Sequence, residues 1–323
     1  MSRIVSTIVC ALTFAAIAQE SKAQNWPARP IRFIVSQAAG GTPDITCRLI
    51  AEKVSHTLGQ QVVVENRPGG GNIIGAQAAA RAAPDGYTFF FATAAALVTN
   101  PYTFKTLPYD PARDFAAVAM IASNPFFLLA HPDLPAASIP ELIAQDRAAS
   151  GRLSAAIDGQ RNFSGMLLAW FNKRAGTSIV QVPYATMPQG TQDAIAGRVQ
   201  LIILAVPSAA PLMQQGRLRG LGVSSAKRLP GYESTPAIAE SVPGFEFIGW
   251  FALVAPAGTP AEIIERMNRA VDAALRDPEI TTRMREAGMY SEGPSTPQQT
   301  AAYIRAQLDE WGRIVREIGL QPE

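Results

Sequence analysis

Short apolar segments with strand character alternate with segments of helical periodicity along most of this chain, and this alternation restricts the fold more than any other feature. Strands are expected at 31–36, 62–64, 87–92, 127–130, 153–157, 179–182, 201–206, 218–223 and 250–255, with helices between most of them. Such alternation is typical of parallel α/β sheets. We therefore expect an α/β fold whose sheets are mainly parallel and flanked by helices.

The order of the segments indicates two lobes. A chain of 323 residues is long enough for two α/β units of ordinary size. A second strand–helix series begins near residue 126, and a Pro/Gly-rich stretch at 230–244 precedes the return of strand character at 250–255. We expect residues 24–123 plus 249–323 to form the first lobe and residues 124–248 the second. Two chain crossings would then link the lobes, which suits hinge closure over a ligand in the cleft.

The N-terminal segment has the pattern of an export signal. Arg3 is followed by an uncharged apolar run at 4–18, and small residues then stand at cleavage spacing at 16–18 or 21–23. The run is shorter than the ~20 residues that span a bilayer, so a retained anchor is the weaker alternative. We expect residues 1–23 to be a signal peptide, cleaved before Gln24, and the mature protein to be soluble in a bacterial periplasm. Cys47 would then be the single cysteine, which excludes an intrachain disulfide.

Composition and motifs argue against several function classes. The net charge is +2 without a block of Lys or Arg, so nucleic acid is not an expected partner. His56 and His131 stand apart from each other and from Cys47, which gives no metal-ligand spacing. The chain lacks a nucleophile elbow, a Walker loop and a dinucleotide fingerprint. We expect neither an enzyme nor a metal or other cofactor.

Two glycine-rich loops between strands and helices are the best candidates for a binding site. Gly40-Gly41 precedes a helix that Thr42 is expected to cap, with Pro43 as its first residue. Helix starts at Ser138, Thr259 and Thr296 have Glu or Gln three residues later and are expected to form capping boxes, whereas the start at Thr42 has Ile45 there. Its amides therefore remain available, and helix N-termini favour anions.

A second loop at 67–72, which contains Gly70, Gly71 and Asn72, follows the next strand and also opens a helix. Both loops would meet at the carboxyl edge of one sheet. We expect the backbone amides of Gly40, Gly41, Thr42 and Asp44, with those of Gly70 to Asn72, to hold one carboxylate. A tight turn with hydrated amides is the alternative.

Many short motifs of the chain resemble one known family in sequence order. The matching segments are Trp26-Pro27-Ala28-Arg29-Pro30-Ile31-Arg32, Ala39-Gly40-Gly41-Thr42-Pro43-Asp44, Val64-Glu65-Asn66-Arg67-Pro68-Gly69, Ala83-Pro84-Asp85-Gly86-Tyr87-Thr88, Leu107-Pro108-Tyr109-Asp110, Val182-Pro183-Tyr184, Pro207-Ser208-Ala209, Ser225-Ala226-Lys227-Arg228 and Ala255-Pro256-Ala257-Gly258-Thr259-Pro260. They resemble the receptors of tripartite tricarboxylate transporters, the Bug family of periplasmic binding proteins.

This resemblance implies a two-lobed periplasmic binding fold of type II, which delivers a small carboxylate to integral membrane subunits of a carrier. It also implies pocket positions beyond the glycine loops. They are Ser36, Gln37 and Ala39 after the first strand, Thr93 and Ala94 after the third, Arg161, Asn162 and Phe163 in the second lobe, and Leu204 before Pro207-Ser208-Ala209. We expect a monomer.

The chain departs from the family pattern where the ligand would lie. Leu97 and Leu204 stand where polar residues are usual, and Arg161 adds a cation. We therefore expect a carboxylate with an aromatic or apolar body, and Arg161 would admit an aromatic diacid. In the alternative reading Arg161 points to solvent or pairs with Asp158. A receptor that presents its bound state to a membrane sensor kinase is the alternative to transport.

Overall fold

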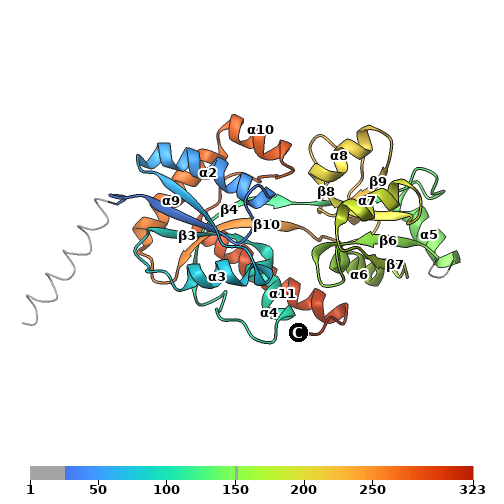
Figure 1. Cartoon of the computed structure of the whole chain (residues 1–323), viewed down its shortest axis with the longest axis horizontal. Coiled ribbons are helices and arrows are strands. Elements are labelled where there is room, and N and C mark those ends of the chain that lie inside the picture. Colours follow the sequence, from blue (N-terminus) through green and yellow to red (C-terminus); the bar gives the residue numbers. More distant parts are fainter. Residues whose placement is uncertain (1–25, 150–151, 323) are drawn as a thin grey trace, which may run out of the picture.

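The protein consists of two lobes, each built on a five-stranded sheet flanked by helices (Figure 1). The computed structural model describes residues 26–149 and 152–322. The signal peptide expected at 1–23 lies outside the described residues.

The sheet of the first lobe has the strand order β2 (Val62–Asn66), β1 (Ile31–Val35), β3 (Thr88–Thr93), β10 (Gly249–Pro256) and β4 (Phe115–Asn124). Strand β1 pairs in parallel with β2 and β3, and β10 pairs antiparallel with β3 and β4. All strands except β10 thus run in one direction. The carboxyl ends of β1, β2, β3 and β4 consequently lie at one edge of the sheet, where β10 begins.

Helices cover both faces of this sheet because its buried strands alternate apolar side chains between the faces. Phe33, Phe89 and Phe91 pack in one core with α2 (Thr42–Leu58) and α9 (Ala261–Leu275), near α10 (Pro278–Glu286). Ile34 and Phe90 pack on the other face. That face carries η1 (Gly70–Asn72), α3 (Ile73–Ala80), η2 (Ala95–Thr99), α4 (Asn100–Thr103) and α11 (Pro297–Glu317).

The sheet of the second lobe has the order β7 (Val180–Pro183), β6 (Ser154–Ile157), β8 (Leu201–Ala205), β5 (Phe126–Ala130) and β9 (Arg219–Val223). Here β5 is the strand that runs against the others. Helices α5 (Ile139–Ala149) and α6 (Phe163–Ala175) pack on one face, and α7 (Met187–Ile195) and α8 (Val206–Gln214) on the other. A short 3-10 helix, η3 (Ile238–Glu240), lies between β9 and β10.

The chain passes between the two sheets twice. One crossing leads from Asn124, the end of β4, to Phe126, the start of β5, and the other leads from β9 to β10. Asn124 pairs with Gly249, the first residue of β10, in the β4–β10 ladder. The two crossings therefore lie side by side where they join the first lobe. The residue boundaries expected for the lobes stay a prediction.

The two-lobed α/β fold expected from the sequence is confirmed, with two local differences. Strand β4 was not expected, and β10 and β5 are antiparallel to their neighbours. Of the expected capping boxes, the one at Thr296 forms, whereas the Thr259 hydroxyl donates to the Pro256 carbonyl and caps no helix. Among the described residues, no helix combines the length and hydrophobicity needed to cross a membrane.

Candidate ligand-binding cleft

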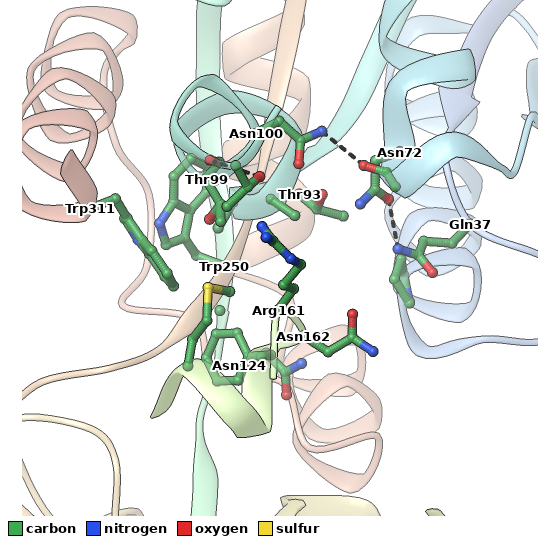
Figure 2. A pocket seen from close by; sticks show the side chains of 18 of the residues that line it. Gln37, Asn72, Thr93, Thr99, Asn100, Asn124, Arg161, Asn162, Trp250 and Trp311 are labelled. Carbon is green, nitrogen blue, oxygen red and sulfur yellow. Dashed lines mark hydrogen bonds between the residues drawn. The ribbon is translucent and has the colours of Figure 1, made fainter. Parts of the chain in front are cut away.

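A cleft of about 620 Å³ lies between the carboxyl edge of the first sheet and the start of α6 in the second lobe (Figure 2). Its lining combines amide and hydroxyl groups with aromatic rings. The polar lining residues are Gln37, Thr42, Asn72, Thr93, Thr99, Asn100, Thr103, Asn124, Asp158, Arg161 and Asn162, and the aromatic ones are Phe104, Phe126, Phe163, Trp250, Phe251 and Trp311. Pro43, Gly71, Ala94, Ala95, Met166 and Gly249 complete it.

The first loop places the start of α2 against the cleft. The N-cap is Gly41, one residue earlier than expected, because Thr42 already has helical geometry and Pro43 follows it in the first turn. No side chain caps this helix. Among the described residues, no protein acceptor takes the amides of Thr42 and Asp44, so these two donors remain available, and the anion site stays a prediction.

The prediction that no local carboxylate claims amides of this loop is wrong for Gly40. The Asp44 carboxylate accepts from the Gly40 amide at 2.9 Å, and the Gly41 amide donates to the Ala38 carbonyl at 3.3 Å. Arg48 and Asn66 also donate to Asp44, whose side chain is buried. Burial raises the pKa of the Asp44 carboxyl, but the hydrogen bonds from Arg48, Gly40 and Asn66 outweigh burial and hold the pKa below its usual range. Asp44 therefore shapes the loop as a fixed anion.

The second loop turns sharply through left-handed backbone conformations. Gly70, Gly71 and Asn72 have φ of 57°, 61° and 78°, and Asn tolerates this region better than other side chains. The Asn72 Oδ1 accepts from the Ser36 hydroxyl at 3.0 Å. It also accepts from the side-chain amide nitrogen of Gln37, Nε2, at 2.7 Å (Figure 2). Asn72 thus joins the loops that follow β1 and β2.

A third segment, which runs from Thr93 at the end of β3 through η2 to Asn100 at the start of α4, completes the polar wall of the first lobe. The Thr93 hydroxyl accepts from the Ala96 amide, and Asn100 Nδ2 donates to the Gly71 carbonyl at 2.8 Å (Figure 2). The Tyr109 hydroxyl donates to the Ala96 carbonyl of the same segment at 2.7 Å. Burial raises the pKa of Tyr109 to about 12, so its hydroxyl stays neutral. A neutral, hydrogen-bonded network therefore holds the three loops in one arrangement.

The opposite wall comes from the loop between β6 and α6. The Ser164 hydroxyl donates to the Asp158 carboxylate and accepts from the Asp158 amide, and Asn162 Nδ2 donates to the Asp158 carbonyl. Arg161 Nη1 donates to the Gln321 carbonyl at 2.7 Å, in the segment that follows α11. Arg161 lines the cleft, as one reading of the sequence expected.

Aromatic side chains from both lobes close the cleft at its base. The rings of Phe126 and Phe163 stack with centroids 4.3 Å apart, and Phe163 also meets Phe247 and Trp311. Trp250 Nε1 donates to Gln307 on α11. The buried Trp311 comes from the same helix, so α11 supports the apolar wall from behind.

The residues expected at the site fall into three groups. Those that line the cleft are Gln37, Thr42, Gly71, Asn72, Thr93, Ala94, Arg161, Asn162 and Phe163. Those that shape its loops without lining it are Ser36, Ala39, Gly40, Gly41, Asp44 and Gly70. Leu204 does neither, because it packs in the core of the second lobe beside Phe127 on the adjacent strand. Leu97 is likewise core, with 1% of its surface exposed.

Other lining residues were not expected at the site. Asn124 and Gly249 reach the cleft through the pairing of β4 with β10, and Trp311 through the packing of α11. Thr99 and Asn100 belong to the irregular helical segment after β3, where two adjacent polar residues that follow an apolar run at 94–98 were the only local signal. Within the described ranges, no group of three or more His, Cys, Asp or Glu side chains is placed to hold a metal ion.

Comparison with known proteins agrees with this geometry. A model of the tripartite tricarboxylate transporter receptor family matches residues 46–320. A UPF0065 protein of Bordetella bronchiseptica is 36% identical over 99% of this chain and 93% of its own length, and BugT of Bordetella pertussis is 32% identical over 99% and 98%.

Solved structures give the same result. Rpa4515 of R. palustris with adipate is 35% identical, with a TM-score of 0.78 over 92% of this chain and 100% of its own. MatC of Rhodopseudomonas palustris with bound malate is 28% identical, with a TM-score of 0.72 over 90% and 100%.

Proposed function

The chain belongs to the tripartite tricarboxylate transporter receptor family, a family of periplasmic solute-binding proteins, and from this membership and its cleft we propose that it captures a small organic carboxylate with an aromatic or apolar body. The observation that carries the proposal is the division of one cleft into two parts. Uncapped helix amides and neutral polar side chains line the first lobe, and aromatic rings line the base.

The polar part suits one carboxylate. The amides of Thr42 and Asp44 point out of the start of α2, where the helix dipole favours negative charge. Gln37, Asn72 and Thr93 contribute neutral polar groups beside them. The relatives with adipate and malate in their structures support a carboxylate as the ligand.

The aromatic part favours an apolar body over a hydroxylated one. A polar ligand group pressed against Phe163 or Trp311 without a partner would cost ~1–3 kcal/mol. An apolar body gains ~25 cal/mol per Å², so ~100 Å² of newly buried surface would contribute ~2.5 kcal/mol. These magnitudes point in the same direction, toward aromatic or alkyl acids.

We further propose that the protein works in the periplasm after removal of residues 1–23, as a monomer that delivers its ligand to integral membrane subunits of a tripartite carrier. The family name supports a transport role over the sensing alternative. Closure of the two lobes over the ligand would create the surface that the carrier recognises.

A thermal-shift screen tests the ligand class. We expect aromatic monoacids, aromatic diacids or aliphatic acids such as adipate to raise the melting temperature, because a ligand that binds only the folded state stabilises it. If only glutamate, aspartate or citrate raises it, the proposed apolar body is wrong.

A pair of variants on one helix tests the aromatic wall. Phe163→Leu keeps an apolar side chain but removes the ring that stacks on Phe126, so aromatic acids should lose more affinity than aliphatic acids. Phe171→Leu is the control, because Phe171 is also on α6 but packs against Phe245 in the core. It should lower stability while leaving the ratio of affinities unchanged. An equal loss for both acid classes in Phe163→Leu would contradict the assigned wall.

A further inference from the structure

Asn124 places a polar side chain in the part of the cleft that aromatic rings line. It is the last residue of β4, and its backbone pairs with Gly249 at the start of β10. A Cβ added at Gly249 would lie 3.6 Å from the Asn124 Cβ and 3.8 Å from Phe163 Cε2. Phe126, two residues after Asn124, stacks on the same Phe163 ring. An amide and two aromatic rings therefore meet at one point of the lining.

The Asn124 amide has no hydrogen-bond partner among the described residues. Its Oδ1 atom is buried and accepts no hydrogen bond. The residue as a whole is only partly buried and lines the cleft, so its accessible polar group is Nδ2, which carries two N–H donors. In Figure 2 the Asn124 amide lies across the cleft from Thr99 and Asn100, and no hydrogen bond joins it to the residues drawn.

This arrangement does not favour the stability of the free protein. A carbonyl that is buried without a donor costs free energy, which an apolar side chain of the same size would not cost. The described part of the chain also supplies no acceptor for the two N–H donors of Asn124. Interactions within the protein therefore give no reason for an amide at this position, whereas a ligand that brings an acceptor to the base of the cleft does.

We propose that Asn124 determines specificity by donating a hydrogen bond from Nδ2 to an acceptor oxygen at the far end of the ligand's apolar body. This inference rests on the proposed function and narrows the ligand class to acids with a second oxygen remote from the first carboxylate. An oxygen elsewhere along the body would lie against rings such as Phe163 or Trp311 without a partner. The cleft therefore selects the position of this oxygen as well as its presence.

Pairs of acids that differ in one oxygen test the contact without a change of charge. The acids 5-oxohexanoate and 5-methylhexanoate have the same chain length, and a carbonyl oxygen in the first replaces a methyl group in the second. The acids para-acetylbenzoate and para-isopropylbenzoate form the same pair on an aromatic ring. Calorimetry gives the ratio of the two affinities within each pair, and this ratio is compared between the unaltered protein and its variants.

Asn124→Leu removes the amide and keeps the size of the side chain. For at least one pair it should lower the affinity of the oxo acid relative to its methyl partner by about three- to tenfold, the effect of one hydrogen bond. The melting temperature of the free protein should stay equal or rise, because the variant no longer buries an unpaired carbonyl.

Two controls separate the donor from the surrounding strand. Asn124→Asp keeps the shape but replaces the donor with a second acceptor, so the ratio should fall as it does in Asn124→Leu. Ser123→Ala alters the neighbouring residue of β4, whose hydroxyl donates to the Tyr290 carbonyl at 3.0 Å and does not line the cleft. It should lower the melting temperature and leave the ratio unchanged.

A further variant tests whether the ligand reaches this point of the cleft. Gly249→Ala adds a methyl group at ordinary van der Waals distances from Asn124 and Phe163, so the protein should fold as before. The methyl group takes the space of the ligand's far end, and both acids of a pair should bind about fivefold more weakly or worse.

The outcomes distinguish a failure of this inference from a failure of the proposed function. If the acids bind but Asn124→Leu leaves the ratio unchanged in both pairs, the contact is wrong and the proposed function stands. A ratio that is retained in Asn124→Asp also overturns the contact, as does undiminished binding of both acids by Gly249→Ala. If none of the four acids binds the unaltered chain, the proposed function itself fails.

Discussion

Asn72 joins two loops of the cleft while its own backbone is left-handed, and these two roles can be separated by substitution. Its Oδ1 accepts hydrogen bonds from Ser36 and Gln37, and its φ is 78°. Asn72→Gly removes both hydrogen bonds but adopts the same backbone without a steric penalty. Asn72→Ala removes them and adds the penalty of a Cβ in the left-handed region.

The expected magnitudes follow from these contacts. Each neutral hydrogen bond contributes about 0.5–1.5 kcal/mol net, so Asn72→Gly should lower the free energy of unfolding by about 1–3 kcal/mol. Asn72→Ala should lower it by about 1 kcal/mol more. Both variants should weaken binding of a monoacid, because the loops after β1 and β2 lose the contact that aligns them.

Urea unfolding at pH 7 and calorimetry with benzoate measure the two effects. Asn72→Asp is a control for backbone tolerance, since Asp also accepts left-handed geometry and two hydrogen bonds. Equal stability of Asn72→Ala and Asn72→Gly would refute the backbone argument. Unchanged stability and affinity in Asn72→Gly would refute the role of the side chain in joining the loops.

Three further outcomes are expected. Asp44→Asn should lower the free energy of unfolding by about 1–2 kcal/mol at neutral pH. The folded pKa of Asp44 is depressed, so the difference in stability between the two proteins is present above the unfolded pKa of about 4. In urea titrations this difference should shrink as the pH falls through the folded pKa. Gly41→Val should weaken carboxylate binding and lower stability, since the extended backbone of Gly41 suits Val but its Cβ would lie 3.3 Å from the Ala38 carbonyl oxygen and shift the turn before Thr42; undiminished affinity in calorimetry would contradict the amide site. Saturating ligand should reduce the radius of gyration in small-angle scattering, and an unchanged curve would argue against closure of the lobes.

Local patterns were sufficient to predict most elements of the fold. Helices were expected between most of the strands, and α6 (Phe163–Ala175) is one of them. A helix start was expected at Thr296, and α11 spans Pro297–Glu317. Strand β4 escaped prediction because its Phe115–Asn124 segment is rich in Ala, which has low strand propensity. Its ladder with β10 makes it a strand, and such pairing between distant segments leaves no local signal.

Contacts between distant segments also limit what can be predicted about single residues of the cleft. Thr42, Asn72 and Arg161 could be placed at the cleft because glycine loops and a family resemblance mark the ends of strands, where parallel sheets bind ligands. Two hydrogen bonds of the first loop could not be predicted, because they depend on the side chain of Asp44 folding back one turn and on Asn66 reaching it from the next strand. In sequence, an acidic residue in the first turn of a helix is compatible with helix amides that are left available to an anion. It is equally compatible with a carboxylate that accepts hydrogen bonds within its own loop, as Asp44 does here.

The apolar character of the cleft was inferred from residues that do not form it. Leu97 and Leu204 are buried in the two lobes, where an apolar residue at a usually polar position changes packing and leaves the cleft surface unaffected. The apolar surface comes instead from Phe126 at the chain crossing, Phe163 at the start of α6 and Trp311 on α11. Phe126 and Phe163 stack on each other within the second lobe, and Trp311 meets Phe163 because α11 packs against α6. Substitution of Leu204 should therefore change stability, whereas substitution of Phe163 should change which acids bind.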